Sequence, residues 1–200
     1  MPNRVTVRTN RKVLLKQIMT SNKRSLALKI RKEIEPKIKK EQLKTVKDFE
    51  TNPITREIKE GPASSGSSGV TGGYGNLFSF IGFESGSKPT FNISEILNRK
   101  IIYSVRSLSG DGSFKITYQI PSLEEVFKST PIPWARGLSW AEGIEKGISN
   151  IGSYVYSNSG VTGSRSGSGI QIEKGFGTVF NTSPYMSRII DELKERIKRI

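Results

Sequence analysis

The sequence contains neither cysteine nor histidine. Without cysteine there is no disulfide framework and no thiolate nucleophile, and without histidine there is no serine–histidine triad. The two residues that most often bind zinc are missing as well. Catalysis would have to depend on carboxylates, lysine or tyrosine alone. These absences favour a protein that is not an enzyme, and we expect no metal and no cofactor.

Apolar residues are also scarce, at 34% of the chain, and aromatic residues reach only 8%. Both values lie below those of an average globular protein. A chain of 200 residues can nevertheless bury an ordinary core as one domain. No stretch approaches the roughly 20 apolar residues that a membrane span needs, so we expect no membrane partner.

The positive charge is unevenly distributed. The formal net charge is +14, and residues 1–60 hold 17 Lys and Arg against 7 Asp and Glu. Residues 61–183 hold 10 against 8, and residues 184–200 hold 5 against 3. A basic N-terminal segment attracts phosphates or acidic proteins, with an affinity that salt weakens. A solvated helix face that keeps the protein soluble explains the same charge equally well.

Residues 1–52 are predicted to form a basic helical arm. A short helix is expected over 11–19, a polar break at 20–23, and a longer helix over 25–49 whose apolar residues recur every four and then every three positions. Pro36 is expected to kink or split this helix, and Asn52-Pro53 to end it. The candidate contacts to DNA or a protein partner are Lys37, Lys39, Lys40, Lys44 and Lys47.

Residues 53–183 are predicted to form a body with two loops. Nine of thirteen residues are Gly or Ser in both 61–73 and 157–169, so both segments are expected to be flexible. Strands are predicted at 77–83 and 154–156, a strand or hairpin at 170–180, and one helical turn at 93–97. The runs 101–108 and 113–120 flank Ser109-Gly-Asp-Gly112, which predicts a β-hairpin.

Capping boxes predict two helix starts, at Ser122 with Glu125 and at Ser139 with Glu142. The second helix is expected to run from Trp140 to about Ile151. The candidate residues for a subunit interface, or for anchoring this helix to the sheet, are Trp134, Trp140, Gly143 and Gly147.

A C-terminal helix is predicted over 184–200. Ser183 is expected to cap it and Pro184 to begin it. Its apolar side is predicted to carry Met186, Ile189, Ile190, Leu193, Ile197 and Ile200. Helices and strands alternate irregularly, so the predicted fold class is α+β: a small antiparallel sheet packed with helices, a long basic N-terminal helical arm and two Gly/Ser-rich loops.

Enzymatic motifs are incomplete. The Gly-rich tract 61–73 lacks the lysine of a phosphate-binding loop, so no nucleotide site is expected. A nuclease or peptidoglycan hydrolase working through glutamates stays open as a hypothesis. Its candidates are Glu124, Glu125, Glu142 and Glu145, but the helix dipole favours acidic residues in a first turn without any catalytic role.

Four stretches of the chain are distinctive when taken together: Asn52–Ile58, Gly72–Phe83, Thr130–Ile148, and Arg165–Gln171 continuing to Asn181–Tyr185. They resemble virion proteins of tailed bacteriophages, of the neck, head-to-tail joining (tail completion) or minor tail class. The resemblance spans roughly residues 50–190 and carries no catalytic signature. The chain departs from this class in its long basic arm and in having Tyr74 where an acidic residue usually precedes Gly75.

The resemblance implies a structural protein that forms a homo-oligomeric ring in the neck and completes the DNA channel. Its expected partners are portal or adaptor proteins on the head side, tail terminator or tail tube proteins on the tail side, and packaged DNA. Assembly would take place in the host cytoplasm, and the protein would be located in the virion. The alternative is a nucleic-acid-binding protein whose N-terminal helices contact phosphates.

Overall fold

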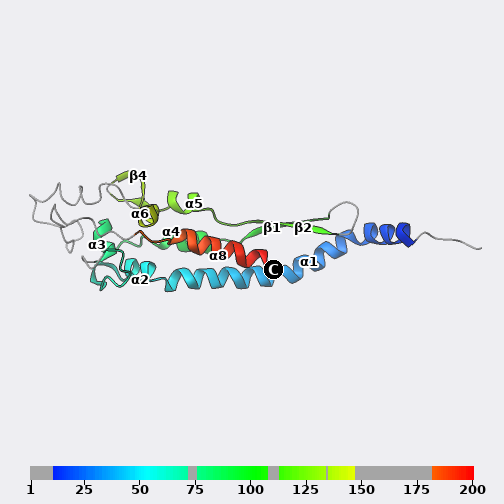
Figure 1. Ribbon diagram of the computed structural model, residues 1–200, viewed down its shortest axis with the longest axis horizontal. Coiled ribbons are helices and arrows are strands. Elements are labelled where there is room, and N and C mark those ends of the chain that lie inside the picture. Colours follow the sequence, from blue (N-terminus) through cyan, green and yellow to red (C-terminus); the bar gives the residue numbers. More distant parts are fainter. Residues whose placement is uncertain (1–10, 72–75, 108–112, 134, 147–181) are drawn as a thin grey trace, which may run out of the picture. The chain divides into compact units, whose positions relative to one another are not determined.

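The computed structural model describes residues 11–71, 76–107, 113–133, 135–146 and 182–200 (Figure 1). The fold is α+β, as predicted: helices dominate, and the described strands form two antiparallel pairs. These residues divide into two compact units. The first unit comprises residues up to Lys39, Ile101–Ile120 and Ile200, and the second comprises Lys40–Lys100 and Pro121–Arg199.

The longest element is α1, Arg11–Thr51, which contributes its first part to the first unit and the rest to the second. The helix is continuous through residues 20–23 and through Pro36, so the predicted break and the predicted split are wrong. Proline removes only one backbone hydrogen bond, and neighbouring turns can retain the helix when they are packed. Ile34 and Ile38, on either side of Pro36, are buried.

The first unit also contains a β-hairpin, which confirms the prediction around residues 109–112. Strand β1, Ile102–Ser107, pairs antiparallel with β2, Phe114–Gln119. The hydroxyl of Tyr103 donates a hydrogen bond to the carbonyl of Arg31 on α1, at 3.4 Å. This contact identifies the side of the hairpin that carries Tyr103 as the side turned toward α1.

In the second unit a helix begins where the sequence predicted only an end. Asn52 follows α1 and caps α2, Pro53–Glu60, by accepting a hydrogen bond from the Ile54 amide at 2.9 Å. Pro53 fits the first helical position, where its missing N–H is not needed. The short 3₁₀ helix η1, Gly61–Ala63, follows directly.

The segment predicted as a strand at 77–83 is a helix, so that prediction is wrong. Helix α3, Leu77–Ile81, is capped by Asn76, whose side chain accepts from the Ser79 amide at 2.8 Å. Gly82 ends the helix in the left-handed conformation, with φ 82°. Leu77, Phe78 and Ile81 are all buried, so the run lacks the alternation that distinguishes a buried helix from a strand.

The next elements agree with the predicted signals. Helix α4, Phe91–Asn98, includes the predicted turn at 93–97. Ser122 caps α5, Leu123–Lys128, and Ser139 accepts from the Glu142 amide at the start of α6, Trp140–Lys146. Strands β3, Pro131–Ile132, and β4, Ala135–Ser139, pair between these helices. The predicted continuation to Ile151 and the strands at 154–156 and 170–180 lie outside the described residues.

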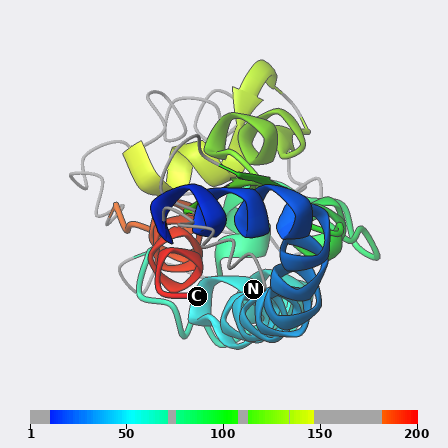
Figure 2. The same cartoon turned by 90° about the vertical axis from the view of Figure 1, so that its right-hand side faces the viewer.

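The last helix is α8, Met186–Lys198. It begins two residues later than predicted: Tyr185, not Ser183, occupies the cap position, and no side chain caps this helix. Its predicted apolar side is confirmed for Met186, Ile189, Ile190, Leu193 and Ile197, which are buried. Figures 1 and 2 both show α8 alongside the C-terminal part of α1, within the second unit.

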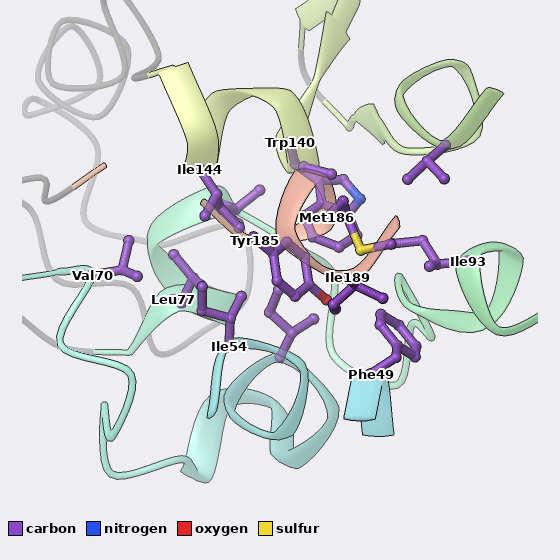
Figure 3. Packing of buried hydrophobic residues seen from close by; sticks show 14 of the residues in the cluster. Phe49, Ile54, Val70, Leu77, Ile93, Trp140, Ile144, Tyr185, Met186 and Ile189 are labelled. Carbon is purple, nitrogen blue, oxygen red and sulfur yellow. The ribbon is translucent and has the colours of Figure 1, made fainter. Parts of the chain in front are cut away.

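The core of the second unit combines residues from distant parts of the chain, from Phe49 on α1 to Ile190 on α8 (Figure 3). Tyr185 is fully buried, with its ring 6.3 Å from the rings of both Phe49 and Trp140. Trp140 in turn meets Phe83 edge-on at 5.7 Å. The Tyr185 hydroxyl shares a hydrogen bond of 2.7 Å with the Thr55 hydroxyl, so this buried polar atom has a partner.

Candidate interaction surfaces

The five lysines predicted to contact DNA or a partner all lie exposed on α1. Lys40, Lys44 and Lys47 belong to the second unit and have the spacing that places them on one side of a helix. Thr45 and Phe49, on the other side, are buried. Lys37 and Lys39 belong to the first unit.

These lysines are not neutralised within the described residues, where no salt bridge joins any of the five to an acidic side chain. The contrast with the rest of the second unit is clear, because Lys59 pairs with Glu50, and Lys128 pairs with Glu124. The exposed lysines of α1 can therefore approach an external anion without first breaking an ion pair.

Among the described residues the positive charge belongs mainly to the first unit. That unit holds 12 Lys and Arg against 2 Glu, whereas the second holds 16 against 14 Asp and Glu. The imbalance makes the first unit the stronger attractor of anions. Its basic residues are Arg11, Lys12, Lys16, Lys23, Arg24, Lys29, Arg31, Lys32, Lys37, Lys39, Arg106 and Lys115.

Of these basic residues, only Lys37 and Lys39 were singled out from the sequence, and two of the others face each other on the hairpin. Arg106 on β1 and Lys115 on β2 are direct cross-strand partners, and both are exposed. A signal was present in the sequence, because the two residues stand at equal distances from the centre of the predicted turn. Strand pairing places such residues opposite each other, on the same face of the hairpin.

The opposite face of the hairpin is apolar and partly buried. It pairs Tyr103 with Tyr118, Val105 with Ile116, and Ser107 with Phe114. The two tyrosine rings lie 6.4 Å apart. Burial, together with the neighbouring Tyr103, raises the pKa of Tyr118 above its ordinary value.

An ion-pair cluster fixes the part of α1 that carries the exposed lysines of the second unit. The Arg196 guanidinium on α8 donates to Asp48 at 2.5 Å and to Thr45 at 3.3 Å, both on α1. It also contacts Glu192, one turn earlier on α8, at 2.9 Å. Only 17% of the Arg196 side chain is exposed, so salt screens this cluster less than an exposed pair.

The Gly/Ser-rich segment that follows α2 is organised by a buried carboxylate. Glu57 is fully buried, and its Oε1 accepts from the Leu77 amide at 2.5 Å while its Oε2 accepts from the Ser68 amide at 2.7 Å. Val70 is also buried. The carboxylate and the burial of Val70 attach this part of the segment to the body of the second unit, and the flexibility predicted for 61–73 stays a prediction. The predicted loop at 157–169 lies outside the described residues.

The interface candidates have different positions. Trp140 and Gly143 are buried inside the second unit, where Trp140 packs on the rings of Phe83 and Tyr185. Of the two alternatives for Trp140, the structure shows anchoring in the core of its own chain. Trp134 and Gly147 lie outside the described residues.

The four glutamates considered for catalysis each have a structural contact. Glu124 pairs with Lys128, which lowers the pKa of that carboxyl. Glu125 pairs with Arg99, and Glu142 pairs with Lys146. Glu145 accepts from the Ser187 amide at 2.7 Å, which ties α6 to α8.

The described residues contain no group of three or more acidic side chains that could hold a metal ion. Similarly, no helix in the described part of the chain is both long and apolar enough to cross a membrane. No family model, curated protein or solved structure matches this chain.

Proposed function

We propose that this chain is a structural virion protein of a tailed bacteriophage, which forms a homo-oligomeric ring in the neck and works without catalysis. The ring would join the portal or adaptor on the head side to the tail terminator or tail tube on the other. It would also complete the channel through which packaged DNA passes. The proposal starts from the resemblance of four stretches to virion proteins of this class.

Two of the resembling stretches supply much of the core of the second unit. Gly72–Phe83 contributes Leu77, Phe78, Ile81 and Phe83, and Thr130–Ile148 contributes Ile132, Trp140 and Ile144. A likeness that includes much of the core fits a protein whose shared requirement is a folded body. An enzyme would be expected to share a set of polar residues around a reaction site.

The observation that carries the ring proposal is the exposed N-terminal part of α1. Leu26 and Leu28 are 39% and 58% exposed, and most other described side chains over 22–33 are exposed as well. Most helical stability in proteins comes from tertiary packing of an apolar face, and this part of α1 has few buried side chains. Leu26 and Leu28 are two positions apart and point to different sides of the helix, so neighbouring subunits on both sides in a ring would cover them and bury apolar surface.

The first experiment compares assembly of the wild type with that of the variant Leu26→Ser/Leu28→Ser. Native mass measurement of the purified protein should give one closed oligomer for the wild type and monomers for the variant. The matched control is Phe91→Ser/Leu138→Ser, which removes two side chains of similar exposure from the second unit and should leave the oligomer intact.

A density map of assembled particles provides the second measurement. The proposal requires several copies of this chain arranged around the DNA channel between head and tail. A single copy per particle, or a location outside the neck, would refute it.

A second candidate function, nucleic-acid binding through α1, is favoured by the five exposed lysines. If most of them contact phosphates, the logarithm of the DNA affinity should fall steeply with the logarithm of the salt concentration, with a slope of roughly −3 to −4 from α1 alone. Changing Lys40, Lys44 and Lys47 to Gln should reduce this slope by about 2.7. A DNA affinity that hardly responds to salt would eliminate this candidate.

A further inference from the structure

The β1–β2 hairpin has two chemically different faces. One carries the tyrosine pair and is turned toward α1 through the Tyr103 hydroxyl. The other pairs Ile102 with Gln119, Ser104 with Thr117, and Arg106 with Lys115. All of these six side chains except Ser104, which is partly exposed, are exposed. We call this second set the outer hairpin face.

The charge on this face is unfavourable for the isolated hairpin. Arg106 and Lys115 stand directly opposite each other, and like charges in that position destabilise a strand pair. Neither strand contains an acidic residue that would offset the repulsion. A bound anion between the two side chains would remove it.

We infer that the outer hairpin face binds the phosphate backbone of double-stranded DNA. The guanidinium of Arg106 can donate two parallel hydrogen bonds to one phosphate, and the Lys115 ammonium supplies a second cation beside it. Ser104, Thr117 and Gln119 add uncharged donors of the kind that contact phosphate and sugar oxygens. The inference rests on the second candidate function, and it adds a DNA-binding surface separate from the lysines of α1.

The arrangement of the aromatic residues favours a duplex over a single strand. Proteins that bind single strands usually stack bases on exposed aromatic rings. Here Tyr103, Tyr118 and Phe114 lie on the opposite face, where they are partly buried and Tyr103 is hydrogen-bonded to α1. The outer hairpin face therefore offers contacts to a backbone but no ring for a base.

The composition of the face also disfavours an acidic protein as the partner. Stable protein interfaces have an apolar centre, whereas this face carries only one apolar side chain, Ile102. Its unit holds 12 Lys and Arg against 2 Glu among the described residues, which suits a polymer with one charge per phosphate.

The test compares Arg106→Thr/Lys115→Thr with a control that loses the same two residue types. The control is Arg136→Thr/Lys88→Thr, whose side chains are exposed in the second unit. Binding of a 30-base-pair duplex of random sequence is measured over a range of salt concentrations. The hairpin variant should lose about two phosphate contacts, so the magnitude of its salt slope should fall by about 1.8 and its affinity at low salt by on the order of tenfold or more. The control variant should change the salt slope and the low-salt affinity by less than the hairpin variant does.

Thermal unfolding distinguishes binding from a purely structural role. Removal of the like-charge pair should leave the midpoint of the hairpin variant unchanged or raise it, because a cross-strand Thr–Thr pair is favourable. A lower midpoint, or an unchanged salt slope, would overturn the inference. Equal binding of polyglutamate would overturn the choice of DNA as the partner.

The results also distinguish a failure of the hairpin surface from a failure of nucleic-acid binding or of ring formation. If the Lys40, Lys44 and Lys47 variant loses DNA affinity and the hairpin variant does not, nucleic-acid binding stands and the hairpin surface is refuted. Ring formation is measured independently by mass, so a failure of DNA binding leaves the assembly proposal to its own experiment.

Discussion

Replacement of the buried Glu57 by glutamine should destabilise the second unit strongly for a single isosteric change. The carboxylate accepts one backbone hydrogen bond on each oxygen, from Leu77 and from Ser68. In the Glu57→Gln variant an amide NH₂ must face one of these N–H donors, so one bond is lost and the other becomes neutral. Hydrogen bonds to a charged group contribute about 1.5–3 kcal/mol each, so we expect a loss of about 2–3 kcal/mol.

The change can be measured at two levels. For a protein of this size, a loss of that magnitude should lower the midpoint of thermal unfolding by roughly 4–12 °C. Hydrogen exchange should show faster exchange of the Ser68 and Leu77 amides in particular, because these groups lose their acceptor. Glu57→Ala removes both bonds and should destabilise by about 3–6 kcal/mol.

The control for this prediction is Glu60→Gln, three residues later on the same helix. Glu60 is exposed and contacts Arg56 and Ser64 at the surface. Exposed pairs of this kind contribute little, so the control should change the free energy of unfolding by about 0.5 kcal/mol or less. The reasoning fails if Glu57→Gln is no more destabilising than Glu60→Gln.

Two further predictions concern contacts between distant parts of the second unit. Tyr185→Phe leaves the buried Thr55 hydroxyl without its partner and should reduce the free energy of unfolding by about 1–3 kcal/mol at neutral pH. Burial raises the pKa of Tyr185 above its ordinary value of 10.0, so the unfolded chain loses this proton first. The stabilisation is therefore fully present below pH 10 and is lost as the pH rises above it. Urea titrations from pH 8 to pH 11 should show a shrinking difference in the free energy of unfolding between the wild type and Tyr185→Phe. A difference that stays constant over this pH range would contradict the prediction. Arg196→Met leaves Asp48 unpaired and should destabilise by about 1–2 kcal/mol in urea unfolding, a figure reduced because Asp48 is partly exposed. Arg188→Met, at an exposed pair on the same helix, should stay within about 0.5 kcal/mol, and equal effects at the two arginines would count against a special role for Arg196.

Local signals in the sequence were sufficient wherever a few neighbouring residues decide the structure. Ser122 and Ser139 cap the helices that follow them, and the turn signal at 109–112 lies between two strands that pair. The apolar spacing after Tyr185 correctly gave the buried side of α8. In each case the backbone hydrogen bonds or the side-chain period act over a few residues, so no distant part of the chain is needed.

Predictions from local sequence were wrong where one sequence signal is compatible with two structures. Asn52-Pro53 is compatible with the end of one helix and with the cap and first residue of another, and the chain uses both. At 77–81 a short helix with Leu77, Phe78 and Ile81 buried has the same kind of apolar run as a buried strand. The Asn76 cap and the Gly82 terminator were the features that distinguish them.

Composition and short-range contacts were enough to predict the α+β class, the excess of positive charge and the helix starts after Ser122 and Ser139. Which groups meet across long separations could be learned only from how the elements pack. Thr55 and Tyr185 are 130 residues apart, and Asp48 and Arg196 are 148 apart. The buried position of Glu57 arises in the same way. Such contacts follow from how elements pack and pair, and a short sequence pattern carries no information about their partners.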